Sequence, residues 1–227
     1  MNTPTEAEPV RVDGGTGGSN GRTAPDAPAR ARAAAALRRL GHALMGHDAD
    51  PVLLERVALA AEGVAADLEA GPARQRDVAE LKRRMFEVEV PDGARVVHFD
   101  ECFVSGPWNP LGIAIEVHRE GDEAVADVVL GPAFEGAPGR SHGGIVAAVF
   151  DDVLGYLLTL HGVPAFTGEL AVRYQAPTPI GQPFTVRARL TGRDGRKLYA
   201  AGEAVADAVT VASATATFVT IERPPGD

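Results

Sequence analysis

The chain has 227 residues, 45% of them hydrophobic, and a formal net charge of -9 at pH 7. This length suits one folded domain with an extension, and the acidic balance argues against a nucleic-acid partner, which requires Lys and Arg gathered on one face. The single cysteine, Cys102, excludes an internal disulfide and a cysteine-rich metal site. Because the N-terminal residues lack a signal-sequence pattern and no apolar run reaches the length of a membrane span, we expect a soluble cytoplasmic protein without a membrane partner.

Residues 1–29 are predicted to form a disordered tail, since they are rich in Gly, Pro, Thr, Ser and acidic residues and have almost no large apolar side chain. A helical pattern follows over residues 31–44. There Leu37, Leu40 and Leu44 recur at three- and four-residue spacing, which predicts a helix with one apolar face.

A second helix is predicted from Asp50 as N-cap and Pro51 at the first helical position, followed by a long run of Val, Leu and Ala. A third helix is predicted over residues 74–86. We therefore expect a helical extension over residues 30–90 and a main domain over residues 91–227, with a Pro-Asp-Gly sequence at the boundary.

Beyond this boundary the apolar residues alternate, which is typical of strands. Turn residues divide the alternating stretches into two hairpins and a last strand. The first hairpin pairs residues 112–120 with 123–131, and the second pairs residues 183–193 with 197–206. The last strand covers residues 210–221. Residues 143–162 lie between the hairpins and are apolar nearly all round, as in a helix that the rest of the fold encloses. The pattern predicts an α+β fold in which a curved antiparallel sheet wraps around one long central helix.

His142, Gly143 and Gly144 stand where a loop enters this helix. The first backbone N–H groups of a helix have no partner within the helix, and the positive end of the helix dipole lies there. Glycines let a carbonyl group approach the backbone closely. The sequence therefore predicts an oxyanion hole, although a tight loop before a helix start would have the same pattern.

Asp151 and Asp152 lie within the most apolar part of the chain. A carboxylate costs free energy there unless it is paired or faces a cavity, and burial raises a carboxyl pKa toward the range of a general base. We expect Asp151 to be the functional acid. Asp152, about 100° further around the helix, is expected to be solvated or ion-paired.

The order of HGG, an acid at Asp151 and a Thr seven residues before Tyr174 resembles the hotdog-fold thioesterases of the PaaI-like, Them-type superfamily. The segments CFVSGPWNPLGI and YQAPTPIG resemble the family's entry segment and its pattern after the central strand. The resemblance covers residues 99–221. It implies a hotdog fold that hydrolyses acyl-CoA thioesters, without a metal or redox cofactor.

The resemblance also implies roles for individual residues. Gly143 would offer the oxyanion N–H, Asp151 would act as general base or nucleophile, and His142 would shape the loop. Thr167, contributed across a dimer interface, would help to place the water. One position departs from the family, because several relatives have Asn where this chain has Gly136.

Other interpretations stay open at several positions. Thr167 also fits an ordinary strand residue. Glu169 falls on the same face as Thr167 by simple alternation, so it is a candidate substrate-binding residue, with Gly144, or else an interface residue. A basic turn is either a site for coenzyme A phosphates or a solvated surface, at Arg189, Arg193, Arg196 and Lys197.

Hydratase chemistry on the same fold is disfavoured, because SGPWNPLG has Pro107 and Gly112 where that chemistry needs an acid and a base. The other rival is a non-catalytic acyl-CoA-binding or sensor protein. We expect an acyl-CoA thioesterase that works as a homodimer or a homotetramer, with the oligomer implied by the family resemblance.

Overall fold

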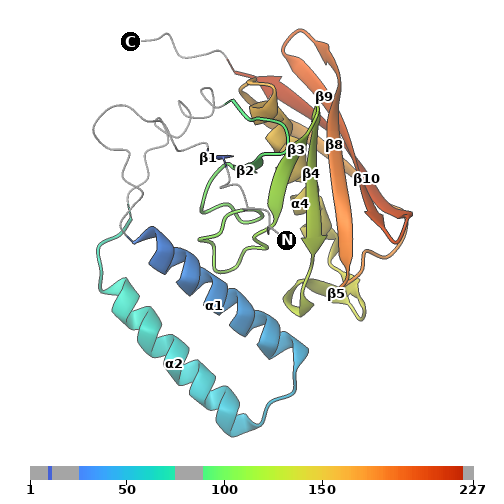
Figure 1. Cartoon of the computed structure of the whole chain (residues 1–227). Helices are drawn as coiled ribbons and strands as arrows, with labels where there is room; N and C mark the ends of the chain where they lie inside the picture. Colours follow the sequence, from blue (N-terminus) through green and yellow to red (C-terminus); the bar gives the residue numbers. More distant parts are fainter. Residues whose placement is uncertain (1–9, 12–25, 75–88, 222–227) are drawn as a thin grey trace, which may run out of the picture.

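The computed structural model describes residues 10–11, 26–74 and 89–221 (Figure 1). The predicted third helix, over residues 74–86, falls outside the described residues except for Arg74. The first strand after the expected helical extension begins at Arg95.

Two helices precede the main domain. Helix α1, Ala27–Gly46, begins earlier than predicted because Pro28 lies in its first turn, where proline is well tolerated. Helix α2, Pro51–Glu69, begins where predicted, and the Asp50 side chain accepts a hydrogen bond of 2.9 Å from the Leu53 amide. The predicted disordered tail is therefore corrected at residues 27–29, which are helical.

Eight strands form one sheet in the order β1-β2-β3-β4-β8-β9-β10-β7. Every neighbouring pair is antiparallel except β1 and β2. The strands are β1 Val10–Arg11, β2 Arg95–Val97, β3 Glu116–Glu120, β4 Glu123–Val129, β7 Ala165–Tyr174, β8 Pro183–Asp194, β9 Lys197–Ala206 and β10 Val209–Thr220. Strand β1 is a second correction to the predicted tail, because Val10 and Arg11 pair with Val96 and Val97.

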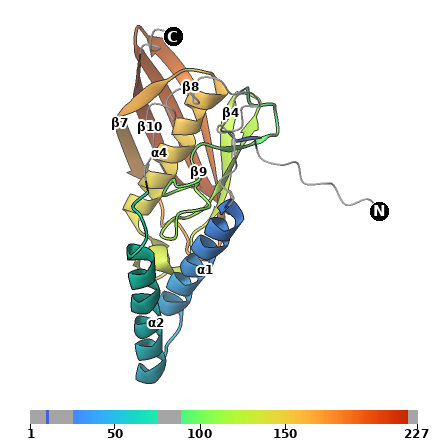
Figure 2. The ribbon, with the colours of Figure 1, turned by 90° about the vertical axis from the view of Figure 1, so that its left-hand side faces the viewer.

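Helix α4, Gly143–Leu160, lies along one face of the curved sheet (Figure 2). Its large apolar residues are buried against the strands, among them Val146, Phe150, Leu154 and Leu157. Gly202 on β9 leaves room for Phe150, whose ring atoms lie 3.5 Å from the point where a Cβ would stand. The predicted α+β hotdog fold, a sheet around a long helix with an N-terminal helical extension, is confirmed.

A short connection leads into this helix. The 3-10 helix η1, Pro132–Phe134, is followed by a small hairpin of β5, Glu135–Ala137, and β6, Arg140–Ser141. The His142 amide donates to the Phe134 carbonyl at 2.8 Å, which closes this loop just before α4 begins.

By length and composition α4 is also apolar enough to cross a membrane, and half of that window is buried inside the protein. Its burial under the sheet accounts for this composition, as in the core helix of a globular domain.

Candidate active site

The N-terminus of α4 presents the Gly143 amide. His142 is the N-cap residue, and its Nδ1 accepts a hydrogen bond of 3.0 Å from the Gly144 amide. The carbonyl of His142 accepts from Ile145 at 2.9 Å. Because Gly144 is already bonded to His142, the amide left for a ligand oxygen is that of Gly143. The expected role of His142 in shaping the loop agrees with this geometry.

Tyr174, at the end of β7, holds the same helix end. Its hydroxyl donates to the Gly143 carbonyl at 2.7 Å. A Cβ at Gly143 would stand 3.2 Å from the Tyr174 ring, so glycine gives the phenol room to reach the backbone. The sequence pattern included Tyr174 only as a landmark, and its contact with Gly143 was missed.

Asp151 lies two turns further along α4, on the exposed side of the helix. Thr167 Oγ1 donates to Asp151 Oδ1 at 3.1 Å. This contact joins α4 and β7 within one chain, so the expectation that Thr167 reaches the acid across a dimer interface is corrected. The expectation that Asp151 is buried is also wrong for the single chain.

A β-bulge at Gly168 decides which residues of β7 face the helix. Thr167 pairs with Phe218 and Glu169 pairs with Thr217, so Gly168 is an extra residue. Thr167 therefore shares the inner face with buried Phe218, whereas Glu169 lies on the outer face with Thr217. The prediction that Glu169 lies on the same face as Thr167 is wrong, because the bulge interrupts the alternation.

The buried acid of α4 is Asp152. Cys102 Sγ donates to Asp152 Oδ1 at 3.1 Å, and Oδ2 is buried without a partner of good hydrogen-bond geometry among the described residues. Burial raises the pKa of the Asp152 carboxyl, while the nearby Ser105 and Cys102 side chains lower it in part. The expectation of a solvated or ion-paired Asp152 is wrong, because the loop that carries Cys102 covers it.

Cys102 is partly buried beside Asp152, in surroundings that disfavour its thiolate form. Burial raises the pKa of its thiol, the negative charge of Asp152 raises it further, and the Val104 amide donates to its sulfur at 3.3 Å. The thiol stays protonated and serves as the hydrogen-bond donor to Asp152.

A polar network continues from this pair along the buried side of α4. The Tyr156 hydroxyl donates to Ser105 Oγ at 3.0 Å, and the His98 ring stacks on the Tyr156 ring with centroids 3.6 Å apart. His98 Nε2 lies 2.6 Å from Thr159 Oγ1, and burial lowers the pKa of His98 to about 3. These groups fasten the loop before β3 to the helix, on a different side from Asp151.

Gly143 and Asp151 of one chain stand too far apart to act on one carbonyl group. Eight residues of α-helix separate them by about 12 Å along the axis, whereas an oxyanion donor and an attacking group each lie about 3 Å from the reacting atoms. The two halves of the expected constellation are therefore at separate points on the surface of one chain.

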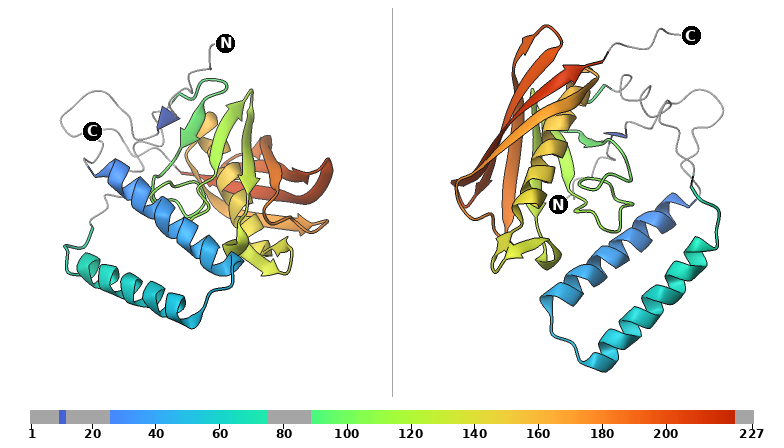
Figure 3. Two further views of the ribbon diagram at one scale, coloured as in Figure 1. Left: turned by 60° about the horizontal axis from the view of Figure 1, so that its bottom comes forward. Right: turned by 180° about the vertical axis from the view of Figure 1, so that it is seen from behind.

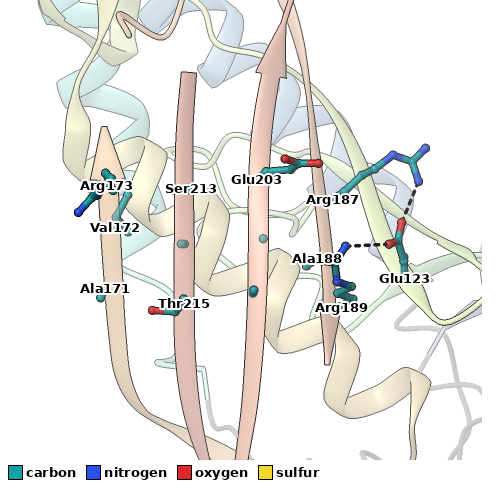
Figure 4. Close-up of a pocket in the computed structure, with 13 residues that line it drawn as sticks. Glu123, Ala171, Val172, Arg173, Arg187, Ala188, Arg189, Glu203, Ser213 and Thr215 are labelled. Atoms are coloured by element: carbon teal, nitrogen blue, oxygen red, sulfur yellow. Dashed lines mark hydrogen bonds and ion pairs between the residues drawn. The ribbon is translucent and has the colours of Figure 1, made fainter. Parts of the chain in front are cut away.

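One hollow in the described structure lies elsewhere, on the face of the sheet away from α4 (Figure 4). It has a volume of about 560 Å³ and is floored by small residues such as Ala171 and Ala201. Arg187 at its rim is held by Glu123 at 3.1 Å and by Glu120 at 2.6 Å. The sheet separates this hollow from Asp151 and Gly143, so it is not the candidate active site.

Over residues 10–11, 26–74 and 89–221, no group of three or more His, Cys, Asp and Glu side chains is arranged to hold a metal ion. In the predicted basic turn, Arg193 and Arg196 donate to the carbonyls of Gly195 and Thr220. Their guanidinium groups are thereby partly satisfied by the backbone.

Comparisons with known proteins agree with this architecture. The family model of the thioesterase superfamily matches residues 139–219, which include His142, Asp151 and Tyr174. A solved structure of a thioesterase superfamily protein is 30% identical, has a TM-score of 0.71, and is matched over 84% of this chain and 90% of that chain. The chain belongs to the thioesterase superfamily.

Curated relatives are matched over a shorter stretch. Acyl-coenzyme A thioesterase THEM4 of Bos taurus is 28% identical over 101 residues, which are 44% of this chain and 41% of that protein. Acyl-coenzyme A thioesterase THEM5 of Mus musculus is 33% identical over 69 residues, which are 30% of this chain and 28% of that protein. The chain thus spans less than half the length of the curated relatives it matches.

Proposed function

We propose that this member of the thioesterase superfamily hydrolyses acyl-CoA to a carboxylic acid and free coenzyme A. The observation that carries the proposal is the hydrogen-bonded pair of Asp151 and Thr167 on the exposed side of α4. An exposed carboxylate that a hydroxyl group orients is suited to activate a water molecule or to attack a carbonyl. The named activities of the curated relatives support acyl-CoA as the substrate.

The Gly143 amide supplies the second requirement. It lies at the helix start with its neighbouring amide bonded to His142 and its carbonyl bonded to Tyr174, so its direction is fixed before substrate binds. A fixed N–H at the positive end of a helix stabilises the negative charge that develops on the thioester oxygen.

The 12 Å between Gly143 and Asp151 leads us to propose a homodimer in which each active site takes its amide from one chain and its carboxylate from the other. Among the strands of the described residues, β7 lies at the end of the sheet and pairs with β10 alone. Unpaired edge strands readily add a strand from another copy. Asp151 also stands on a helix side of small residues, Gly144, Ala147 and Gly155, which permit close approach of a second helix.

In the proposed reaction, the Gly143 amide of one chain binds the thioester oxygen. Asp151 of the other chain takes a proton from a water molecule held by Thr167, and the water oxygen adds to the carbonyl carbon. The tetrahedral intermediate then expels the coenzyme A thiolate, which takes up a proton. In the alternative route, an Asp151 oxygen adds to the carbon and the C–S bond breaks, so the coenzyme A thiolate leaves and takes up a proton. Water then hydrolyses the resulting mixed anhydride, which releases the carboxylic acid and restores Asp151.

The proposed cellular location is the cytoplasm. The single cysteine supports a reducing compartment.

The test is release of free thiol from short, medium, long and aromatic acyl-CoAs, with the purified full chain. Wild-type protein should turn over at least one class, and Asp151→Asn should lower kcat by roughly 10² to 10⁴, because it removes the base or nucleophile. Asp122→Asn is the matched control, since it makes the same change at an exposed turn. Binding of acyl-CoA without turnover would instead assign the chain to the non-catalytic acyl-CoA-binding proteins.

A further inference from the structure

Helices α1 and α2 form a helical hairpin that lies beside the main domain. Helix α1 lies between α2 and the domain, and the two helices run antiparallel (Figure 3). The loop between them is short, from His47 to Asp50. The hairpin has no part in the reaction described above.

Helix α1 is fastened to the domain along one side. Arg38 donates to the carbonyls of Asn109, at 2.7 Å, and Pro107, at 3.1 Å. His42 packs edge-on against Phe134 with ring centroids 5.1 Å apart, and its Nδ1 accepts from the Ala133 amide at 3.2 Å. These contacts fix the position of the hairpin relative to the main domain.

The apolar residues of the hairpin are exposed. Leu37, Leu40 and Leu44 follow one face of α1 and are 50%, 42% and 47% exposed. Helix α2 has no buried residue at all, although Val and Leu recur along it. Leu59 and Val64 are each 60% exposed and Leu68 is 74% exposed. A helix with this composition is normally covered by a partner surface.

The charges of the two helices are opposite. Helix α1 carries four arginines and no acidic residue, whereas α2 carries four acidic residues and one arginine. Arg32 and Arg39 of α1 make no ion pair with a described residue. In a twofold pairing, α1 of one copy lies beside α2 of the other and each contact joins opposite charges, so the hairpin surface is complementary to itself.

We infer that the α1–α2 hairpin is a self-association surface, and that its partner is the hairpin of a second copy of this chain. The exposed leucines and valines of two hairpins form the core of a four-helix bundle, with the opposite charges of α1 and α2 alternating around it. This surface is separate from Asp151 and the outer edge of β7. Together the two surfaces give an assembly twice the size of the proposed active-site dimer.

The match to the solved thioesterase superfamily structure covers 84% of this chain, more than the main domain alone contains, so it also includes residues before the main domain.

The first experiment removes the apolar surface. The variant carries Leu59→Gln, Val64→Gln and Leu68→Gln, and the control carries Val129→Gln and Val209→Gln, at strand residues that are likewise exposed. Sedimentation equilibrium should give half the wild-type mass for the variant and the wild-type mass for the control. An unchanged mass for the variant would overturn the inference.

The second experiment uses charge to ask whether the contact is between chains. An acidic variant carries Arg30→Glu, Arg32→Glu and Arg39→Glu, and a basic variant carries Glu55→Lys, Glu62→Lys and Glu69→Lys. In either variant alone, α1 and α2 carry charge of the same sign, so its assembly should have half the wild-type mass. An equimolar mixture of the two variants should form assemblies of the full wild-type mass. Failure of the mixture to regain it would contradict pairing between chains.

These readouts separate other occupants of the surface. If residues 75–88 of the same chain cover α2, the apolar variant melts at a lower temperature with unchanged mass. If the surface holds the acyl chain of a substrate, KM for long acyl-CoAs rises with unchanged mass. Either result overturns the inference. The masses of the assemblies in both experiments are measured without an activity assay. If the proposed hydrolysis is wrong, these measurements therefore still test the hairpin.

Discussion

Thr167 Oγ1 and Asp151 Oδ1 lie 3.1 Å apart within one chain, and this contact ties the edge strand β7 to the central helix. The hydroxyl points at the carboxylate because the bulge at Gly168 turns Thr167 to the inner face and Glu169 to the outer face.

Replacement of Thr167 should therefore have a large effect and replacement of Glu169 a small one. Thr167→Val removes a hydrogen bond to a charged group, worth about 1.5–3 kcal/mol, so kcat/KM for acyl-CoA should fall by roughly 10- to 100-fold. Thr167→Ser keeps the hydroxyl and should keep most of the rate. Glu169→Gln should have the wild-type rate, and a loss comparable to that of Thr167→Val would contradict the assignment of faces.

The Gly143 amide can be removed with a matched control. Proline is tolerated at the first position of a helix, and the extended conformation of His142 suits a residue that precedes proline. Gly143→Pro should lower kcat by about 10² to 10³, because one oxyanion donor is lost. Gly143→Ala places a similar Cβ near Tyr174 but keeps the amide, so it should retain far more activity. Equal losses in thiol-release assays of the two variants would show that crowding, and not the amide, is responsible.

Asp152 should destabilise the folded protein at neutral pH. Burial raises the pKa of its carboxyl above the value in the unfolded chain, and the charge of Asp151 raises it further. At pH values below the unfolded pKa of about 3.9, both states are protonated. As the pH rises above that value, the unfolded chain ionises first, so the free energy of unfolding falls until the folded-state pKa is passed.

Asp152→Asn removes this ionisation, so it should increase the free energy of unfolding at pH 7 and have little effect near pH 3. Urea denaturation of the wild-type protein and the variant between these pH values measures the difference. A variant that is less stable at pH 7 would show that the ionised carboxylate strengthens its contacts with Cys102 and Ser105.

Tyr174→Phe tests the support of the helix start. The change removes the hydrogen bond to the Gly143 carbonyl, which is worth about 0.5–1.5 kcal/mol. We expect a corresponding fall in the free energy of unfolding and a rise in hydrogen exchange at the first turn of α4. Tyr199→Phe on β9 is the control. If it changes the free energy of unfolding and the hydrogen exchange of α4 as much as Tyr174→Phe does, the assigned role of Tyr174 is contradicted.

Much of the fold follows from sequence patterns, because burial imposes a period on apolar residues. The central helix was predicted at its true start since Gly143 follows a loop and precedes an unbroken apolar run. The predicted hairpins match β3 with β4 and β8 with β9, because Gly121 and Gly195 provide the positive φ angles that their turns need. Strand β1 was missed, because two residues carry no periodic signal.

The site was predicted less completely, because its residues depend on contacts that no local pattern contains. Adjacent Asp151 and Asp152 have the same local sequence context, and the loop around Cys102 decides which one is buried. Simple alternation placed Glu169 beside Thr167, since a bulge depends on the pairing with β10. An isolated glycine at Gly168, within a strand of larger residues, was the available signal for that bulge.

The central claim is that Gly143 of one chain and Asp151 of its partner form one active site. The most direct test co-expresses Gly143→Pro and Asp151→Asn chains with different affinity tags and isolates the mixed assembly. A shared site predicts that the isolated mixed dimer has about one half of the wild-type rate, because one of its two sites combines an intact Gly143 with an intact Asp151. A mixed assembly with no more thiol release than its two parents would contradict the shared site.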